Sequence, residues 1–294
     1  MEVRVIRSFL AVARERSISG AAKVLHISQP SLSRQIMDLE EELGVTLFLR
    51  GNRNITLTEQ GMLLRKRAEQ IVDLVQKTED ELASADGTVT GTIHIGAGET
   101  HAFRTLAHAI HHMAGKYPDI RFTVFSGNAE DVMERLDKGL VDFGVLIEPY
   151  DVSKYDYLRL PMQDVWGVLM RKDSPLAALD AVQADDLRGL PLICSRQALG
   201  GGQLSSWFKA GYEKLNVVTS YNLLFNASLL AEAGVGYVVC IENILNTTGA
   251  SSLCFRPLKP ALTSQVNLVW KKHQIFSKPS ELFLDSLHDE SLVS

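Results

Sequence analysis

The chain has 294 residues, 46% of them hydrophobic, and a formal net charge of −5, which is typical of a globular protein with two or three domains. No apolar run approaches the roughly 18 residues of a membrane span, and charged residues interrupt MEVRVIRSFLAVARER where a signal peptide would be apolar. These features exclude a membrane-spanning or secreted chain, so we expect a cytoplasmic protein with no membrane partner.

The N-terminal segment has the pattern of two short helices joined by a tight turn. Apolar spacing predicts a first helix over Val3–Arg14. A second helix is expected to begin at Ser17–Ser19, and its Ala21 and Ala22 are small enough to let another helix approach closely. A turn of only three residues, His26–Ser28, then leads to the next helix. Helix, short turn and helix together predict a helix-turn-helix.

The third helix is predicted within ISQPSLSRQIMDLEEEL, residues 27–43. Ser28 is a suitable N-cap, and Pro30 falls in the first turn, where its missing N–H costs little. Gly44 then predicts the end of the helix. The expected buried stripe is Leu32, Ile36, Leu39 and Leu43.

A basic hairpin is predicted after this helix. LFLR and ITLT read as two strands around the tip GNRN, which places Arg50 and Arg53 at or beside the turn. A helix-turn-helix followed by such a hairpin is a winged one. Residues 1–70 contain 11 Lys or Arg against 8 Asp or Glu, whereas the rest of the chain is acidic. This imbalance fits a small anion-binding head on an acidic body.

A long helix is predicted from Thr58 to about Ala85, with a narrow apolar stripe that repeats every three or four residues. Such a stripe is typical of a coiled-coil seam, and we interpret the segment as a dimerisation helix. The seam residues are Leu64, Ala68, Ile71, Val75, Thr78 and Leu82. DGTVTG, residues 86–91, is interpreted as a hinge-like linker.

Beyond residue 91 the pattern alternates between strands and helices. TIHIGAG, IRFTVFSG and VDFGVLI form one group of expected strands, and DVWGVLMRK, PLICS, VVTSY, YVVCI and LCFRPL form a second. Alternation of this kind predicts parallel strands with crossover helices. The final strand QVNLVWKK and a helix from about Pro279 to His288 can return to the first group. We therefore expect two α/β lobes around a cleft.

Enzyme motifs are not found along the chain. G-x-S-x-G, H-E-x-x-H and C-x-x-C do not occur, so we expect neither catalysis nor a cofactor. Cys194, Cys240 and Cys254 have no metal-ligand spacing and lie in or near apolar runs, which favours buried structural thiols. His108 and His112 are four residues apart, but no nearby Cys or carboxylate completes a metal site.

The stretch from FLAVARERSISGAAKVLHISQPSLSRQ to ITLTEQG resembles the N-terminal signature of LysR-type transcriptional regulators. GTIHIGAG, GVLMRKDSPLA, LRGLPLI, LLAEAGVGYVV and NLVWKK are similar to the effector-binding domain of that family, which resembles periplasmic solute-binding proteins. The likeness covers essentially the whole chain. It implies a repressor or activator that senses a small molecule and binds double-stranded promoter DNA as a homotetramer of paired dimers.

The resemblance and the predicted elements together indicate an α/β fold class with four segments. Residues 1–58 would form the winged helix-turn-helix and residues 59–86 the dimerisation helix. Effector-binding lobe I would comprise residues 87–161 and 267–294, and lobe II would comprise residues 162–266.

In a helix-turn-helix the start of the second helix of the motif enters the major groove. We therefore expect Gln29 and Ser33 to bond base edges and Pro30 to meet a thymine methyl, while Ser31 and the helix N-terminus favour a phosphate. Arg34 could contact a base or a phosphate. The candidate DNA-binding residues are Ser28, Gln29, Pro30, Ser31, Ser33, Arg34, Arg50 and Arg53.

Effector contacts are expected at strand ends that face the cleft. The position matching Thr100 commonly binds effector in similar proteins, and Arg196 would reinforce an anion. Glu99 and Glu148 instead favour a zwitterion, so a carboxylate and an amino-acid-like ligand both remain open. The candidates are Glu99, Thr100, His101, Ser126, Gly127, Asn128, Glu148, Ser195, Arg196, Gln197, Phe225 and Asn226. Two alternatives are a redox-sensing regulator using Cys194 and a DNA-binding protein without an effector.

Overall fold

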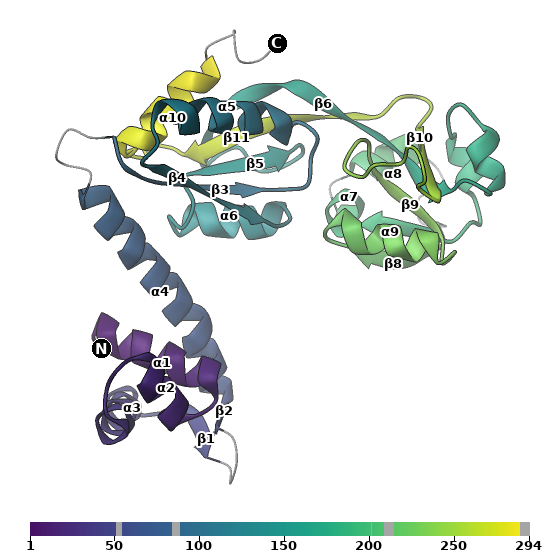
Figure 1. Ribbon diagram of the computed structural model, residues 1–294. Helices are drawn as coiled ribbons and strands as arrows, with labels where there is room; N and C mark the ends of the chain where they lie inside the picture. Colours follow the sequence, from purple (N-terminus) through teal and green to yellow (C-terminus); the bar gives the residue numbers. More distant parts are fainter. Residues whose placement is uncertain (51–54, 84–88, 201, 209–214, 289–294) are drawn as a thin grey trace. The chain divides into compact units, whose positions relative to one another are not determined.

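The computed structural model describes residues 1–50, 55–83, 89–200, 202–208 and 215–288. It divides into two compact units, Met1–Ala83 and Ser84–Ser294, each with its own core (Figure 1). None of the helices in these ranges is long and apolar enough to cross a membrane. The proposed linker overlaps residues 86–88, which lie outside the described ranges.

The N-terminal unit is a winged helix-turn-helix followed by a long helix. Its elements are α1 (Val3–Glu15), α2 (Ile18–Val24), α3 (Gln29–Leu43), β1 (Phe48–Arg50), β2 (Ile55–Leu57) and α4 (Glu59–Ala83). The two strands pair in antiparallel register. The predictions of three helices and a hairpin in this order are confirmed.

Local side-chain chemistry sets the helix boundaries of this unit. The Ser17 hydroxyl accepts a hydrogen bond from Gly20 N at 3.2 Å, and the Ser28 hydroxyl accepts one from Ser31 N at 3.3 Å. Both are N-caps that satisfy a free backbone donor. Gly44 ends α3 with a φ of 67°, and His26 forms the turn with a φ of 54°, a backbone region that histidine tolerates better than most residues.

The core of the unit lies between α1, α3 and the wing. Leu32, Ile36 and Leu39 are buried there, and the ring centroids of Phe9 and Phe48 are 5.2 Å apart. Leu43 is 38% exposed, so its predicted place in the buried stripe is wrong.

The reason is that the chain turns at Gly44, immediately after Leu43, and Leu47 and Phe48 fill the space instead. Glu40 fixes this turn by accepting hydrogen bonds from Leu47 N at 2.6 Å and Phe48 N at 3.1 Å.

Helix α4 has an inner face that belongs to the same core. Ala68 is fully buried, and Leu64 and Ile71 pack beside it against the winged helix-turn-helix. The first half of the predicted coiled-coil seam therefore packs within the N-terminal unit. Farther along, the exposed Thr78 donates its hydroxyl proton to Leu74 O at 2.8 Å. The side chain of Leu82 lies outside what the structure describes.

The second unit contains two α/β lobes, as predicted. Lobe I has β3 (Gly91–Ala97), β4 (Ile120–Ser126) and β5 (Phe143–Ile147), with α5 (Phe103–Lys116), α6 (Ala129–Asp137) and α10 (Lys278–His288). Strand β3 pairs in parallel with β4 and β5. The ring centroids of Phe122 and Phe283 are 5.7 Å apart, and this contact packs α10 against the lobe.

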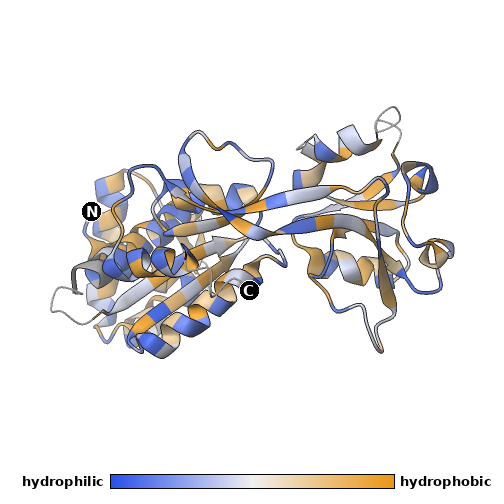
Figure 2. Cartoon of the chain, turned by 90° about the horizontal axis from the view of Figure 1, so that it is seen from above, coloured by the Kyte–Doolittle hydropathy of each residue, from blue (hydrophilic) through white to orange (hydrophobic). Residues whose placement is uncertain are grey.

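Lobe II is built in the same way. It has β7 (Leu192–Ser195), β8 (Val217–Tyr221), β9 (Tyr237–Ile241) and β10 (Leu253–Pro257), with α7 (Arg196–Gly200), α8 (Gln203–Phe208) and α9 (Leu224–Glu232). Two short 3-10 helices span Pro175–Ala178 and Ala184–Leu187. Strand β7 pairs in parallel with β8 and β9. Figure 2 shows that the strands of both lobes are mainly apolar, whereas the helices have mixed faces.

Two long antiparallel strands connect the lobes. They are β6 (Tyr155–Arg171) and β11 (Thr263–Lys271), and they lie side by side between the lobes (Figure 1). Strand β11 also pairs with β5 of lobe I, while the later part of β6 pairs with β9 and β10 of lobe II. The proposed lobe limits near residues 161 and 266 fall inside these strands, and the polar ends of the shorter strands meet beside them.

Candidate functional site

The first turn of α3 presents short polar side chains to solvent. Ser28, Gln29, Pro30 and Ser31 are all exposed, while Ser33 is half-buried. The side chains are short and uncharged, so a partner could approach the helix backbone closely. The positive end of the helix dipole at this turn also favours a negative group such as a phosphate.

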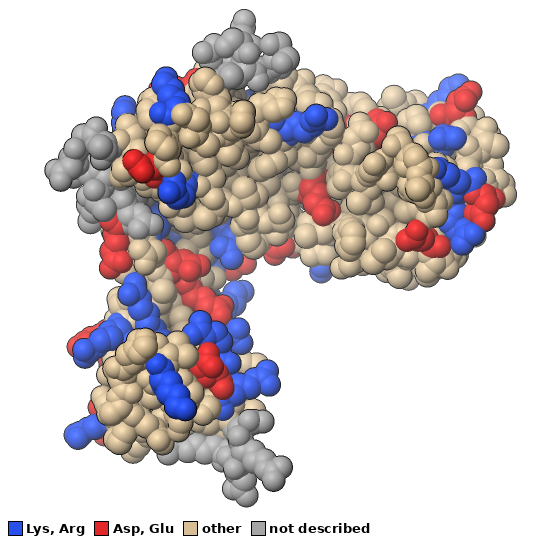
Figure 3. Space-filling model, viewed as in Figure 1, with Lys and Arg blue, Asp and Glu red and all other residues tan. Residues whose placement is uncertain are grey.

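The described basic residue nearest to this turn along α3 is Arg34. Arg34 is exposed one turn farther along α3, and Figure 3 shows Lys and Arg side chains gathered on the N-terminal unit. Arg50 ends β1, but its side chain is outside the described part of the chain, and so is the whole of Arg53. The contribution of the wing arginines therefore stays a prediction.

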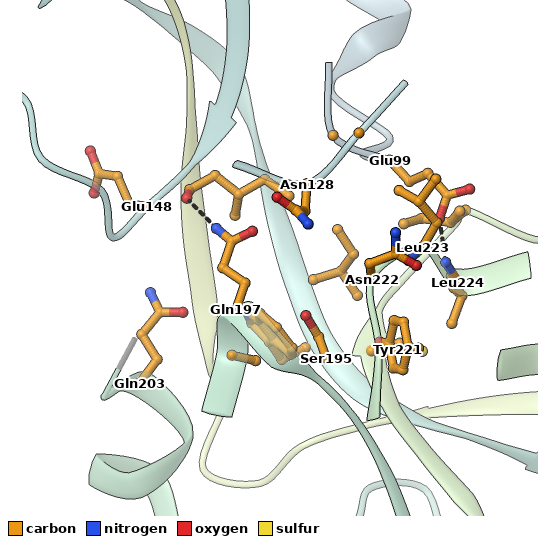
Figure 4. Close-up of a pocket in the computed structure, with 18 of the residues that line it drawn as sticks. Glu99, Asn128, Glu148, Ser195, Gln197, Gln203, Tyr221, Asn222, Leu223 and Leu224 are labelled. Atoms are coloured by element: carbon orange, nitrogen blue, oxygen red, sulfur yellow. Dashed lines mark hydrogen bonds between the residues drawn. The ribbon is translucent and has the colours of Figure 1, made fainter. Parts of the chain in front are cut away.

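A cleft between the lobes collects the ends of strands from both sides (Figure 4). Its cavity volume is about 70 Å³, and an adjoining hollow of about 350 Å³ shares part of its wall. Predicted residues that line the cleft are Glu99, Gly127, Asn128, Glu148, Ser195 and Gln197. Lining residues that the sequence analysis missed include Trp166, Gln203, Tyr221, Asn222, Leu223 and Cys240.

Other predicted effector residues lie elsewhere. Thr100, His101 and Ser126 line a second open hollow, which shares Gly98, Glu99 and Ile244 with the cleft, and Arg196 lines the other adjoining hollow. Phe225 is 59% exposed on α9, and neither it nor the exposed Asn226 lines the cleft. Asn222, Leu223 and Leu224, which lead into and begin α9, line the cleft instead.

The Thr100 hydroxyl is already engaged by a buried carboxylate. It donates to Asp164 Oδ1 at 2.9 Å and accepts from Ala102 N at 3.1 Å. Asp164 lies on β6 and is only 2% exposed. Burial raises its pKa to about 6, against the lowering effects of the Thr100 hydrogen bond and of His101. Thr100 therefore tethers the end of β3 to β6 in this structure.

Two hydrogen bonds cross the cleft. The Glu99 carboxylate of lobe I accepts from Leu224 N in lobe II, and Gln197 Nε2 of lobe II donates to Ile147 O of lobe I at 3.3 Å (Figure 4). Leu223, the N-cap of α9, has no side-chain cap of its own. Glu99 thus supplies the acceptor that the first turn of α9 otherwise lacks.

Glu148 belongs to a second polar group at the cleft. Asn267 Nδ2 donates to Glu148 Oε1 at 3.0 Å and to the Tyr150 hydroxyl at 2.9 Å. The pKa of Tyr150 is raised to about 12, first by burial and further by the charge of Glu148, although the Asn267 hydrogen bond lowers it. Glu148 therefore makes the local potential negative.

The thiols have the surroundings of structural cysteines. All three are buried and free, and burial raises the pKa of Cys194 and of Cys240 to about 12 in each case. Cys194 packs with Val239, whereas Cys240 packs with Val238 in a different cluster. Within the ranges that the structure describes, no three His, Cys, Asp or Glu residues are grouped as a metal site would require.

Both units match family models. Residues 3–62 match the bacterial regulatory helix-turn-helix protein of the lysR family, and residues 86–291 match the LysR substrate binding domain. The uncharacterized HTH-type transcriptional regulator YfeR of Shigella flexneri is 26% identical over 290 residues. This alignment covers 98% of the present chain and 94% of YfeR.

Solved structures with the same fold include CbnR, a LysR family transcriptional regulator. Its crystal structure gives a TM-score of 0.77 at 19% identity and covers 100% of both chains. Full-length CbnR complexed with its target DNA gives a TM-score of 0.74 at 19% identity, over 98% of this chain and 99% of that one. These similarities show that the fold extends over both units.

Proposed function

Because the chain belongs to the LysR family of DNA-binding transcriptional regulators, we propose that it reads a promoter with the first turn of α3 and responds to a small molecule in the interlobe cleft. The observation that carries the DNA-reading part is the exposed Ser28 to Ser31 turn, which is capped, short in its side chains and free of acidic residues. A regulator of this kind acts in the cytoplasm, where the promoter is.

Base reading is assigned to Gln29 and Ser33. A Gln amide can bond an adenine edge with two hydrogen bonds, and a Ser hydroxyl can donate or accept. Pro30 offers an apolar contact for a thymine methyl group. Ser28 and Ser31, together with the helix N-terminus, hold a phosphate.

Affinity is assigned to the surrounding cations. Arg34, Arg50 and Arg53 would neutralise phosphates, and each contact of this kind makes binding weaker as the salt concentration rises. Recognition of the base sequence and attraction to the phosphates are thus assigned to different side chains of the same unit.

The test uses DNA fragments that the wild-type protein selects from its source genome. Gln29→Ala and Ser33→Ala should each lower the affinity for a selected fragment about tenfold or more, which corresponds to about 1–3 kcal/mol per base contact, with little change for random DNA. Electrophoretic mobility shift measures both.

Gln35→Ala is the matched control. Gln35 lies on the same helix but accepts a hydrogen bond from the Ser8 hydroxyl at 3.0 Å, so it faces α1. Its loss should leave the sequence preference intact. If sequence preference survives the combined Gln29→Ala and Ser33→Ala change, these residues are not the readers.

We assign assembly to α4. Its first-half stripe covers the winged helix-turn-helix, so the surface left for a second copy includes the exposed Leu63 and Leu74, which are 61% and 44% accessible. Val75 is half-buried and Thr78 is exposed along the same helix. We propose that dimers form here and pair into tetramers. Leu74→Glu should reduce the mass measured by light scattering, whereas Asp73→Glu should not.

Regulation requires the ligand to favour one arrangement of the lobes or subunits over another. Ligand binding between the lobes would change the interlobe contacts and hence the spacing of the DNA-reading units. The redox alternative is not favoured, because a thiol switch needs an accessible thiolate and Cys194 is buried with a raised pKa. An effector-independent protein would show the same DNA footprint with and without every small molecule tested.

A further inference from the structure

The charges that line the cleft are all of one sign. Among the described residues that form its wall, the charged side chains are Glu99 and Glu148. No ion pair within the described ranges neutralises either one. Arg196, the predicted anion partner, is exposed and lines the adjoining hollow together with Glu130.

The two carboxylates stand at opposite ends of the space. Figure 4 shows Glu99 beside Leu224 at one end and Glu148 at the other, with Asn128, Gln197 and Ser195 between them. Glu99 uses Oε2 for Leu224 N, and Glu148 uses Oε1 for Asn267. Within the described part of the chain, each keeps its second oxygen for another donor.

Apart from Gln203 and Asn222, the remaining wall is mainly apolar and aromatic. Ile147, Trp166, Tyr221, Ile241 and Ile244 line it. Apolar walls reduce the local dielectric screening, so the field of the two carboxylates acts on a bound molecule more strongly than it would in water. The aromatic rings in this wall add an attractive surface for a cation but not for an anion.

The tyrosines at the cleft report the same field. Burial is the main cause of the raised pKa of Tyr150, and the charge of Glu148 adds to it. Burial also raises the pKa of Tyr221, with smaller contributions from Cys240, Cys194 and lastly Glu99. A bound carboxylate would meet the repulsion that these phenols meet on losing a proton.

We propose that the effector of this cleft is an organic cation, a protonated amine on a compact apolar body, held between Glu99 and Glu148. This inference rests on the proposed function of the cleft as the effector site. The ammonium donates to the second oxygen of one carboxylate and the other carboxylate adds to the negative potential, while the apolar body lies against the ring of Trp166 and the isoleucines.

Three probes of nearly equal size and different charge test the proposal: butylamine, butyrate and butanol. Each is titrated into the full-length protein without DNA, and binding is followed by ligand-observed NMR. Butylamine should bind at least about tenfold more tightly than butyrate or butanol, a difference of about 1.4 kcal/mol.

Isosteric variants identify the source of the preference. Glu148→Gln and Glu99→Gln retain an acceptor oxygen for Asn267 and Leu224 N, so the local hydrogen bonds survive. Each should weaken butylamine binding about fivefold or more and leave butanol binding unchanged, which also verifies the fold. Glu242→Gln is the matched control, since Glu242 follows β9 but does not line the cleft.

Three results would overturn the proposal. They are tighter binding of butyrate than of butylamine, a preference for the amine that persists in the combined Glu99→Gln and Glu148→Gln variant, and no saturation by butylamine up to about 50 mM, the range expected for so small a ligand. Failure of the proposed function is separate, because it would appear as loss of selective DNA binding by the ligand-free protein.

Discussion

The carboxylate of Glu99 accepts a hydrogen bond from the backbone N–H of Leu224, which joins the end of β3 in lobe I to the first turn of α9 in lobe II. A negative group at a helix N-terminus interacts favourably with the helix dipole. The same carboxylate therefore links the lobes, caps a helix and forms one end of the proposed cation site. Binding of an amine and contact between the lobes are coupled through one side chain.

Replacement of Glu99 separates these roles. Glu99→Ala should lower the free energy of unfolding by about 1 kcal/mol, because a charge-assisted hydrogen bond and a helix cap are lost. Glu99→Gln should cost less, since its amide oxygen still accepts from Leu224 N. Urea denaturation measures both variants. Equal losses would mean that the hydrogen bond does not stabilise the unit.

Asp164 should make stability depend on pH. Its pKa is about 6 in the folded protein and near 3.8 in the unfolded chain, so the folded state binds the proton more tightly. The free energy of unfolding should therefore decrease as the pH rises from about 4 to above about 6. The total decrease should be about 2–3 kcal/mol at most.

Asp164→Asn removes this titration. Its stability relative to wild type, measured by urea denaturation between about pH 4.5 and pH 7.5, should therefore rise with pH. Thr100 keeps an amide oxygen to bond in this variant. A difference that stays constant with pH would show that Asp164 does not titrate in this way.

Leu39 and Leu43 should differ sharply although both lie on the predicted stripe of α3. Leu39 is 1% exposed in the core, so Leu39→Ala should cost about 2–5 kcal/mol. Leu43→Ala should cost under about 1 kcal/mol because the side chain is partly in solvent. Thermal unfolding of the two variants provides the comparison, and similar costs would place Leu43 in a contact with another copy of the chain.

The thiols should be inert in the native protein. Burial raises the pKa of Cys194 to about 12, so the thiolate is scarce near neutral pH. Ellman's reagent should therefore react slowly with the folded protein and quickly in denaturant. Peroxide should not alter DNA affinity, and Cys194→Ser should behave as wild type. Rapid labelling of Cys194 before unfolding would revive the redox alternative.

Local signals in the sequence predicted the N-terminal unit well. The caps Ser17 and Ser28 and the stop at Gly44 depend on residues within one turn of each other, so they can be read from the chain. The exposure of Leu43 and the burial of Ala68 depend on tertiary packing instead. Glu40, seven residues before Leu47, forms a contact that no helix period reveals.

The location of the cleft could be predicted from the sequence, but only some of its lining residues could. Strand ends gave Glu99, Asn128 and Glu148 because the fold class brings those ends together. Trp166 was missed because it lies inside the long strand β6, not at an end. Tyr221 is the last residue of β8. Its position at the end of the predicted strand VVTSY could have indicated that it lines the cleft. Phe225 also follows a predicted strand, but it lies exposed on α9 and does not line the cleft.

Lobe II is inserted between β6 and β11, and this nesting sets an order in which the protein can be made. The winged unit is complete within the first 83 residues, so it can fold while the ribosome is still adding the remainder, at roughly 5–20 residues per second. Lobe I must wait for Thr263–Lys271, which complete its sheet. During that interval β5 has an open edge beside a finished lobe II. A chain that stops between β10 and β11 would therefore hold the strands of lobe II but lack the strand and the helix α10 that complete lobe I, the lobe that begins earlier in the sequence.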